Sequence, residues 1–359
     1  MKKTNAIVLL LLWGVLTLSV WLLPDRAISD SERRPLAQKP VFSAESLLSG
    51  KFMSDFEAYT LDQFPLRDTF RTVKALFHQF ALGQKDNNGI YLTGGYAVKQ
   101  EYPLDEGSID HAISRFTALY EKYLTDSDIY MAIVPDKNFY FAETAGQIRM
   151  DYDRLFSRFR EELPWAEMID LTAILSQDSY YRTDTHWRQE ALDDAARAIC
   201  GAMGISPMED LQQTVLEQPF YGVYYGQAAL PMEPDTLFLL ENELLENCTV
   251  QDYETGKTGP VYDLDKLSGK DPYEVYLSGP KSLLTIHNPA GQAGKELLIF
   301  RDSFGSSIAP LLVADYETVT LIDIRYIQMD VLERFIDFQG QDVLLLYSTL
   351  VLNNSETIK

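Results

Sequence analysis

Apolar residues follow three successive patterns along the chain. An unbroken apolar run covers residues 6–23. From residue 46 to 82, aromatic and aliphatic residues recur three or four positions apart, and Pro65 divides this stretch into two helices. Beyond residue 90, short blocks rich in Ile, Val and Leu alternate with segments of helical spacing. The pattern predicts one membrane-length helix followed by an α/β domain.

Strands separated by helices predict a mainly parallel sheet with helices on both faces. Residues 205–290 do not continue the alternation of strands and helices, and we expect an irregular, aromatic-rich insertion there. The expected organisation is an anchor at 1–24, a linker at 25–45 and one domain at 46–359. Expected strands cover 129–134, 168–170, 296–300, 318–322 and 343–346, and expected helices cover 108–124, 151–162, 188–203, 306–312 and 330–338.

The N-terminal run has the length and the flanks of a membrane anchor. Its 18 residues, at 6–23, would span about 27 Å as a helix, close to the thickness of the hydrocarbon core. Lys2 and Lys3 precede it, and Trp21 suits the interface at its outer end. A cleaved signal peptide is the alternative, but the run is long and no A-x-A site precedes Pro24. We therefore predict an uncleaved single-pass anchor with the C-terminal domain outside the cytoplasm.

Composition narrows the functional classes. Among 359 residues, 46% are hydrophobic, which supports a packed core and argues against disorder. The formal net charge of −22 repels phosphate backbones, so we expect no nucleic-acid partner. Only Cys200 and Cys248 carry thiols, which is neither a disulfide framework nor the spacing of a zinc site.

Ser303 lies where a strand is expected to give way to a helix, in the stretch KELLIFRDSFGSSIAPLL at 295–312. A serine on such a turn projects its hydroxyl above the carboxyl edge of the sheet, beside N–H groups that can receive developing negative charge. The alternative is that Ser303 only caps the helix, as serine often does.

A nucleophilic serine needs a base, and four histidines are available. In the segment YYRTDTHWRQEAL, Asp184 precedes His186 by two residues. In extended backbone these two side chains point the same way, so the carboxylate can orient the imidazole. His287 is the second candidate base, whereas His78 and His111 lie on ordinary amphipathic helices. Asp184 and His186 as metal ligands would need a third ligand, for which the sequence offers no obvious candidate.

The motifs DTHW at 184–187 and RDSFG at 301–305 resemble the DHHW family of bacterial surface proteins, which is similar to the SGNH-type acetyltransferases that O-acetylate alginate. The resemblance implies a three-layer α/β/α SGNH-hydrolase-like domain and a catalytic triad of Ser303, His186 and Asp184. Where the family has Gly-Gly-Asn, this chain has Ser278, Gly279 and Pro280. Further stretches agree with the family: SERRPLAQKP after the anchor, SGKFMSDFEAYTLDQFPLRD at 49–68, VPDKNFYF at 134–141, PDTLFLL at 234–240 and LIDIRYI at 321–327.

Because this chain lacks the Gly-Gly-Asn of the family, the resemblance does not identify the group that donates a hydrogen bond to the oxyanion. The Ser303 amide is one expected donor, and Arg301, Asn288 and Gly279 are weaker candidates for contacts with the substrate or the oxyanion.

The expected function is transfer of an acyl group, foremost acetyl, to a cell-surface polysaccharide through a serine acyl-enzyme. No cofactor is expected. Because acetyl-CoA is cytoplasmic, the resemblance implies a multi-pass membrane acyltransferase as the donor partner. An esterase or deacetylase would use the same residues, and a non-catalytic glycan-binding or scaffold protein on the same fold is the third reading.

Overall fold

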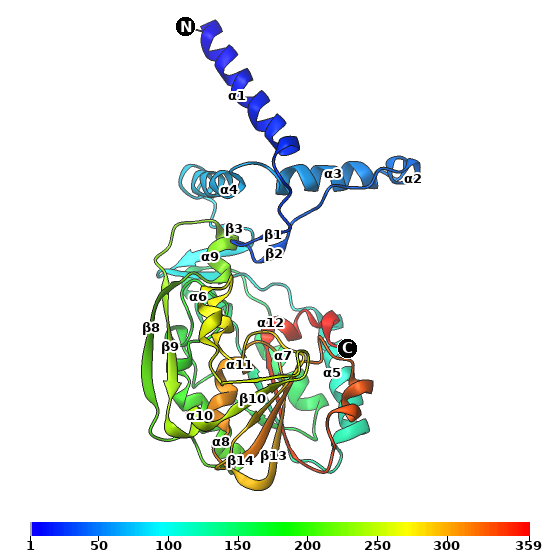
Figure 1. Cartoon of the computed structure of the whole chain (residues 1–359), viewed down its shortest axis with the longest axis vertical. Coiled ribbons are helices and arrows are strands. Elements are labelled where there is room, and N and C mark those ends of the chain that lie inside the picture. The colour runs from blue at the N-terminus through cyan, green and yellow to red at the C-terminus, as the bar shows by residue number, and fades with distance from the viewer. Residues whose placement is uncertain (1) are drawn as a thin grey trace. The chain divides into compact units, whose positions relative to one another are not determined.

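The computed structural model describes residues 2–359, so Met1 of the expected anchor lies outside the described residues. The chain divides into two compact units (Figure 1). The first comprises the chain up to Tyr91 together with Val223–Glu233, and the second comprises Leu92–Gly222 and Pro234–Lys359. Residues 46–91, which the sequence assigns to the large domain, therefore group with the anchor and the linker.

The first unit is mostly helical. Helix α1 is apolar and long enough, over Thr4–Leu22, to cross a membrane. Pro65 separates two helices as expected. The elements of this unit are α1 (Lys2–Leu22), β1 (Ile28–Ser29), β2 (Arg34–Pro35), α2 (Ala44–Leu48), α3 (Lys51–Asp62), α4 (Arg67–Leu76), the π-helical turn η1 (Phe77–Ala81), β3 (Asp86–Asn87) and α9 (Val223–Ala228).

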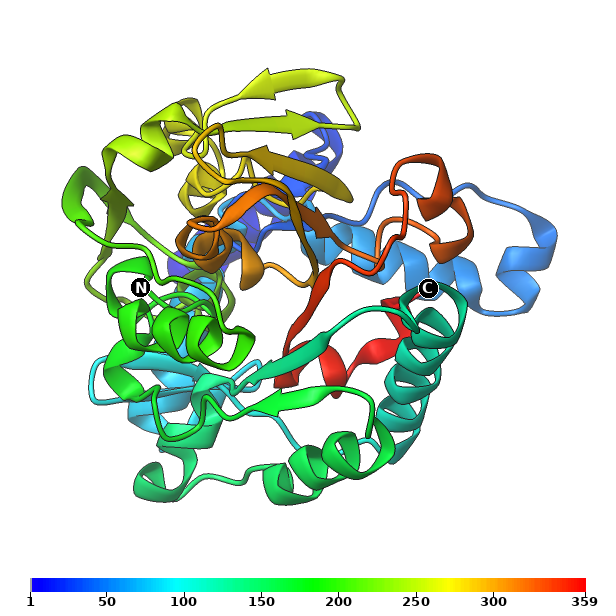
Figure 2. The same cartoon turned by 90° about the horizontal axis from the view of Figure 1, so that it is seen from below.

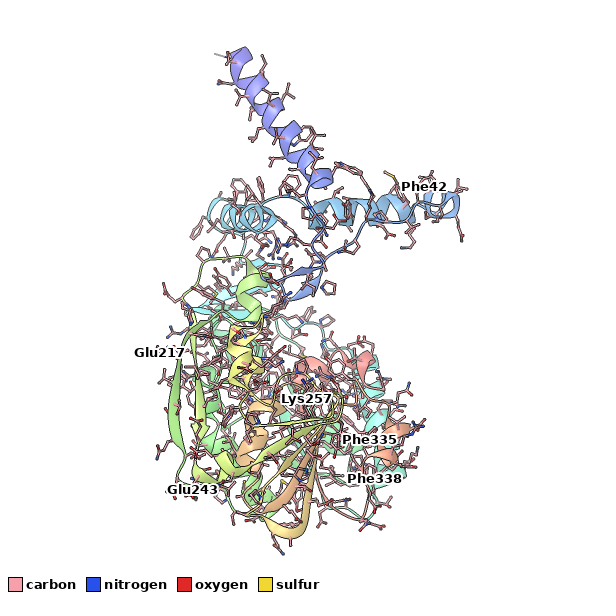
Figure 3. All side chains as sticks on the ribbon, viewed as in Figure 1. Phe42, Glu217, Glu243, Lys257, Phe335 and Phe338 are labelled. Atoms are coloured by element: carbon pink, nitrogen blue, oxygen red, sulfur yellow. The ribbon has the colours of Figure 1, made fainter. Side chains whose placement is uncertain are left out.

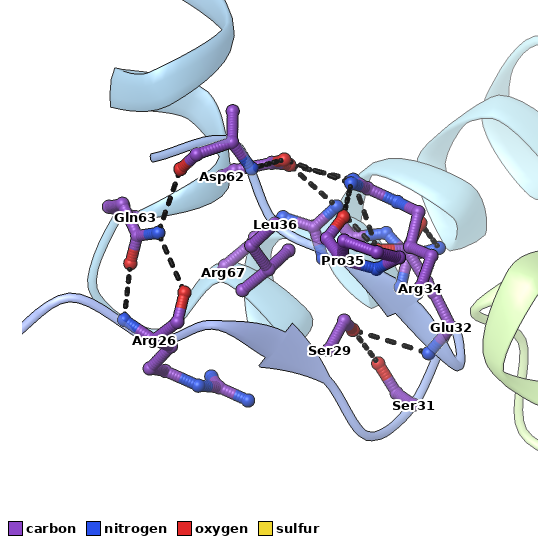
Figure 4. Close-up of polar contacts among 12 residues, drawn as sticks. Arg26, Ser29, Ser31, Glu32, Arg34, Pro35, Leu36, Asp62, Gln63 and Arg67 are labelled. Carbon is purple, nitrogen blue, oxygen red and sulfur yellow. Dashed lines mark hydrogen bonds and ion pairs between the residues drawn. The ribbon is translucent and has the colours of Figure 1, made fainter. Parts of the chain in front are cut away.

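Polar contacts order the segment that the sequence presents as a linker (Figure 4). The guanidinium of Arg34 donates to both carboxylate oxygens of Asp62, at 2.9 and 2.7 Å, and this bond lowers the pKa of Asp62. Gln63 exchanges two hydrogen bonds with the backbone of Arg26, at 2.8 and 2.9 Å. The β1–β2 hairpin is thereby fixed to the C-terminal end of α3.

The second unit is built on an eight-stranded sheet of order β11-β10-β12-β14-β13-β15-β6-β7 (Figure 2). Strands β14, β13, β15, β6 and β7 are parallel, whereas β12, β10 and β11 add an antiparallel edge. The expected α/β class with a mainly parallel sheet is confirmed. The strands are β6 (Ile129–Val134), β7 (Glu167–Ile169), β10 (Thr249–Asp252), β11 (Lys257–Gly259), β12 (Leu283–His287), β13 (Gln292–Arg301), β14 (Tyr316–Ile322) and β15 (Asp342–Ser348).

The segment expected to be irregular contains regular structure. It supplies β10, β11 and β12 to the sheet and a separate antiparallel ribbon of β8 (Gln212–Phe220) with β9 (Asp235–Glu241). Two further short strands, β4 (Ile90–Thr93) and β5 (Tyr96–Lys99), precede the first long helix. The strand at 90–92 is predicted by its flanking Asn88-Gly89 and Gly94-Gly95, which are typical of a hairpin, and β4 confirms it. The sequence signal for the strands of the insertion is weak because three of them have only three to five residues.

Two of the expected helices are shorter in the structure. The helix expected at 188–203 begins only at Asp193, and residues Gln189–Ala191 before it form a 3₁₀ turn. The buried side-chain amide of Gln189 bonds the carbonyl of Ser307 and the N–H of Leu240. Only a 3₁₀ helix covers part of 330–338. The helices are α5 (Glu106–Leu119) with its π-helical extension η2 (Tyr120–Leu124), α6 (Lys137–Ala145), α7 (Tyr152–Glu162), α8 (Asp193–Met203), α10 (Glu243–Asn247), α11 (Gly305–Ile308), α12 (Thr349–Leu352), and the 3₁₀ turns η3 (Gln177–Ser179), η4 (Gln189–Ala191), η5 (Leu264–Ser268), η6 (Pro272–Val275), η7 (Ala309–Leu312), η8 (Met329–Arg334) and η9 (Ser355–Thr357).

Buried residues lie on both faces of this sheet. Along β13, Leu297 and Ile299 join one core cluster, whereas Leu298 and Phe300 join the other. The alternation follows from the two-residue period of a strand. Helix α8 packs in the first cluster, and α5 and α7 pack in the second. A strand buried on both faces reads as a continuous apolar run, as LLIF does here.

Candidate active site

Ser303 lies on a rigid turn at the carboxyl end of β13. The strand's last residue, Arg301, pairs with Leu346 of the neighbouring strand β15. The next residue, Asp302, is fully buried, and its carboxylate accepts bonds from the Phe304 N–H at 3.0 Å and the Ser348 N–H at 2.8 Å. Asp302 thereby fastens the turn to the carboxyl end of β15. Ser303 itself is partly exposed.

Asp184 and His186 lie on a tight loop of the second unit. The loop closes through a bridge between Tyr180 and Trp187. Its backbone is held by Asp235 of β9, whose carboxylate accepts from the N–H groups of Arg182 at 2.7 Å and Thr183 at 2.8 Å. Asp184 is fully buried and His186 nearly so, at 7% exposure. The positions of both side chains are thus determined by long-range bonds and not by the loop alone.

The three side chains form one continuous chain of hydrogen bonds. Nε2 of His186 lies 2.8 Å from Oγ of Ser303, and Nδ1 lies 2.6 Å from Oδ1 of Asp184. The same carboxylate oxygen accepts the backbone N–H of His186 at 3.0 Å. An ionised carboxylate only accepts, so it selects the tautomer with the proton on Nδ1 and leaves Nε2 to accept from the serine hydroxyl.

Aromatic side chains enclose the imidazole. Tyr273 stacks on the His186 ring with centroids 3.9 Å apart and an interplanar angle of 8°, and Phe304 lies at 5.0 Å. The Tyr273 hydroxyl is 2.9 Å from Oγ of Ser307, which also accepts from Trp187 Nε1 at 2.9 Å. Sequence reasoning missed Tyr273, whose only signal was the abundance of aromatic residues between 205 and 290.

Lys137 is a second residue that the sequence did not single out. It is buried at the start of α6, and its ammonium donates to the carbonyl oxygens of Tyr181 at 3.0 Å and Arg182 at 3.3 Å. Burial lowers the pKa of Lys137 to about 7, against the opposing effect of Asp184 and Asp235. Lys137 therefore supports the loop that carries Asp184, and its signal was the segment VPDKNFYF.

Two of the weaker candidates for contacts with the substrate or the oxyanion make no described contact with Ser303. Arg301 is fully buried, and burial lowers its pKa; its side chain packs against Gly305, where an added Cβ would lie 2.7 Å from the Arg301 Cβ. Gly279 has φ +86°, and a Cβ there would meet the side chain of Glu274. Neither Arg301 nor Gly279 has a described contact with Ser303, so a direct substrate role receives no support from the contacts of either residue.

Asn288 lies at the opposite end of the sheet from Ser303. It follows β12, which is antiparallel to β14, and His287 pairs with Thr318 near the start of β14. Its buried amide donates to the carbonyl of Val313 at 2.9 Å. The expectation of an oxyanion role for Asn288 is therefore corrected, and the same strand direction removes His287 as a base for Ser303.

The other two histidines, His78 and His111, make hydrogen bonds with residues outside the triad. His78 contacts Gln84 at 2.7 Å, and His111 contacts the carbonyl of Ile358 at 2.9 Å. Within the part of the chain that the structure describes, no group of three or more His, Cys, Asp or Glu residues is placed to hold a metal ion. Cys200 and Cys248 are buried free thiols.

The sheet, its helical layers and the serine at the carboxyl edge define an SGNH-like α/β architecture. Residues 166–322 match the family model described as DHHW protein, which confirms the resemblance to the DHHW family over that segment. No curated protein matches the chain.

Solved structures share the fold. A DHHW family protein from Eubacterium siraeum is 20% identical, with a TM-score of 0.61 over 76% of this chain and 95% of its own. PatB1 of Bacillus cereus is 17% identical, with a TM-score of 0.62 over 75% and 98%. PatB1 with a sulfonyl adduct gives a TM-score of 0.60 at 17% identity, over 75% and 96%.

Proposed function

We propose that this chain is a membrane-anchored, extracytoplasmic O-acyltransferase that transfers an acyl group, foremost acetyl, to hydroxyls of a cell-surface polysaccharide. The observation that carries the proposal is the hydrogen-bonded sequence Ser303–His186–Asp184, with a partly exposed hydroxyl and a buried base and carboxylate. Nucleophile, base and orienting group in hydrogen-bond reach are the signature of an activated serine.

The reaction proceeds in two half-reactions. Oγ of Ser303 attacks the carbonyl carbon of an acyl ester, and its proton passes to Nε2 of His186. His186 then protonates the leaving alcohol, which leaves an acyl-serine. A sugar hydroxyl gives its proton to Nε2 and attacks the acyl-serine, so a new ester forms and Ser303 is regenerated. Asp184 remains ionised and stabilises the imidazolium in both steps.

The oxyanion is assigned to backbone donors. Among the described residues, the N–H of Ser303 has no hydrogen-bond acceptor, so it is available to the tetrahedral intermediate. Helix α11 after the turn has only four residues and therefore contributes individual N–H groups and no extended helix dipole.

The proposed location follows from α1, which has the length and composition of a spanning helix. A domain outside the cytoplasm has no access to acetyl-CoA. The proposed donor is therefore a multi-pass membrane acyltransferase that presents the acyl group, and the proposed acceptor is a glycan.

The test uses the full chain in detergent with p-nitrophenyl acetate. Ser303→Ala should abolish release of p-nitrophenol above background, whereas Ser157→Ala, at a half-buried serine of α7, should not change it. Because PatB1 has been obtained with a sulfonyl adduct, an aryl sulfonyl fluoride is a second probe, expected to modify wild type and not Ser303→Ala.

An added acceptor oligosaccharide separates transferase from esterase, because only a transferase diverts the acyl group from water to sugar. Equal activity of wild type and Ser303→Ala would refute the enzyme and favour the scaffold reading.

A further inference from the structure

An exposed apolar stripe runs along α4 and its π-helical continuation η1. Its five residues are spaced four, three, four and three positions apart, which places them on one helical face. Their exposed fractions lie between 46% and 78%. They are Leu66, Phe70, Val73, Phe77 and Phe80.

The opposite face of α4 is turned inward within the first unit. Arg67 pairs with Glu32 at 2.5 Å, and Arg71 donates to the carbonyl of Gly226 at 3.0 Å and pairs with Glu32 at 3.1 Å. The polar face of this helix is therefore the internal one, and its apolar face points outward. That arrangement is the reverse of an amphipathic helix packed on a soluble core.

The exposed apolar surface is concentrated in this part of the chain. Among the described residues beyond Leu23, thirteen of the twenty-one exposed large hydrophobic residues lie between Ile28 and Leu82. Phe42, 64% exposed, lies near the end of α2 and α3 that is distant from α4 (Figure 3). Large apolar residues exposed in this number within one unit indicate an interaction surface.

Contacts connect this surface to the outer end of the anchor. Trp21 of α1 packs on Phe56 of α3 with ring centroids 5.8 Å apart. The Tyr59 hydroxyl donates to Asp25, just beyond α1, at 2.8 Å. Helix α3 is therefore fixed where α1 ends, which is where the bilayer surface lies if α1 spans the membrane.

We propose that α3, α4 and η1 lie in the headgroup region of the membrane, with the α4–η1 stripe embedded at the boundary of the acyl chains. The proposal rests on the proposed anchor. Phe and Leu on one face with Arg and Lys on the other, in a helix lying beside a spanning segment, is the composition of an interfacial helix. The function of this platform would be to hold the first unit on the bilayer surface and not on a flexible tether.

Charge and length favour lipid over a second protein chain. Beyond α1, the first unit carries 9 Lys and Arg against 10 Asp and Glu, so almost all of the net charge of −22 resides in the second unit and the platform does not strongly repel anionic lipid. The stripe spans about two heptads, whereas a coiled-coil pairing of two copies needs three or four.

The experiment places an environment-sensitive NBD fluorophore on single cysteines in the full chain. Variants Val73→Cys and Phe77→Cys probe the stripe, and Lys74→Cys, at an exposed charged position beside it, is the matched control. The chain without an added cysteine measures background labelling of the two buried native thiols. Each variant is reconstituted into vesicles of phosphatidylethanolamine and phosphatidylglycerol, with and without nitroxide on the acyl chains.

At positions 73 and 77 we expect blue-shifted emission and at least twofold stronger quenching by the acyl-chain nitroxide than at position 74. Water-like emission at 73 and 77 would overturn the proposal. Blue-shifted emission without quenching would also overturn it, because protein and not lipid then covers the stripe. Alkaline carbonate extraction tests the anchor separately: a chain that stays in the vesicles while its stripe is not quenched refutes the platform alone.

Discussion

Replacing Asp184 by Asn removes one charge beside His186 and keeps the shape of the side chain. In the wild type, Oδ1 lies 2.6 Å from Nδ1 and can only accept, so the ring proton stays on Nδ1. The amide nitrogen of Asn can instead donate to Nδ1. The proton then moves to Nε2, which faces Oγ of Ser303 and can no longer accept its proton.

The distance and the burial set the size of the effect. At an effective dielectric constant of about 20, unit charges at this separation attract each other by about 6 kcal/mol. This attraction is present only when the imidazole is charged, that is, in the transition state. The dipole of the Asn side chain replaces a part of this attraction. Since about 1.4 kcal/mol corresponds to a tenfold change in rate, we expect kcat/KM to fall about 10⁴-fold.

The assay is p-nitrophenyl acetate hydrolysis by the full chain, with circular dichroism to verify the fold. Asp193→Asn, at an exposed carboxylate of α8, controls for the general effect of losing one negative charge. A loss smaller than tenfold in a folded Asp184→Asn protein would refute the role of Asp184, because the buried pair would then contribute nothing specific to the transition state.

Gly222→Ala should lower kcat/KM at least tenfold and reduce the melting temperature. The added Cβ would lie 2.2 Å from Cβ and 2.4 Å from Cα of Asp184. Gly201→Ala is the control and should change neither quantity, because no atom lies within 4 Å of the added Cβ there. Unchanged kinetics in Gly222→Ala would show that the loop adapts. Lys137→Met should flatten the pH dependence of stability above neutrality. The unfolded state keeps the Lys137 proton up to its ordinary pKa of 10.5 and the folded state releases it near 7, so the wild type gains up to about 1.4 kcal/mol per pH unit in between. Urea unfolding at pH 7 to 9 measures this, and equal slopes in both proteins would contradict it.

The candidate site was accessible from the sequence because each part has a local signature. Ser303 follows a buried strand, and Asp184 and His186 are two residues apart. The sequence predicts extended backbone there, whereas the structure has a bend in which the His186 N–H donates to Oδ1 of Asp184. The structure brings His186 and Ser303, 117 residues apart, within 2.8 Å. The strand and helix alternation indicates that Ser303 lies at the carboxyl edge of the sheet. The position of His186, 17 residues beyond the end of β7, depends instead on long-range bonds such as those from Asp235.

The residues that support the triad, Tyr273 and Asp235, could not be predicted from local sequence patterns. Tyr273 stacks on His186 from a 3₁₀ turn, and Asp235 bonds the loop from a separate ribbon, so neither role depends on local spacing. Strand direction is equally non-local. The short strand β12 runs antiparallel to β14, and this reversal places Asn288 at the end of the sheet opposite Ser303.

The helices between 46 and 82 show a different limit of sequence patterns. Apolar residues at helical spacing predict an amphipathic helix, but the same spacing serves a helix on a protein core and a helix on a bilayer. The two cases differ in which face of the helix makes hydrogen bonds and ion pairs with the rest of the protein. In α4 the guanidinium groups of Arg67 and Arg71 are bonded within the unit, while Phe77 and Phe80 remain exposed at 56% and 78%. A helix that buries its cations and exposes its phenylalanines fits the lipid-covered position proposed for α4 and η1, beside the end of α1 in the same unit.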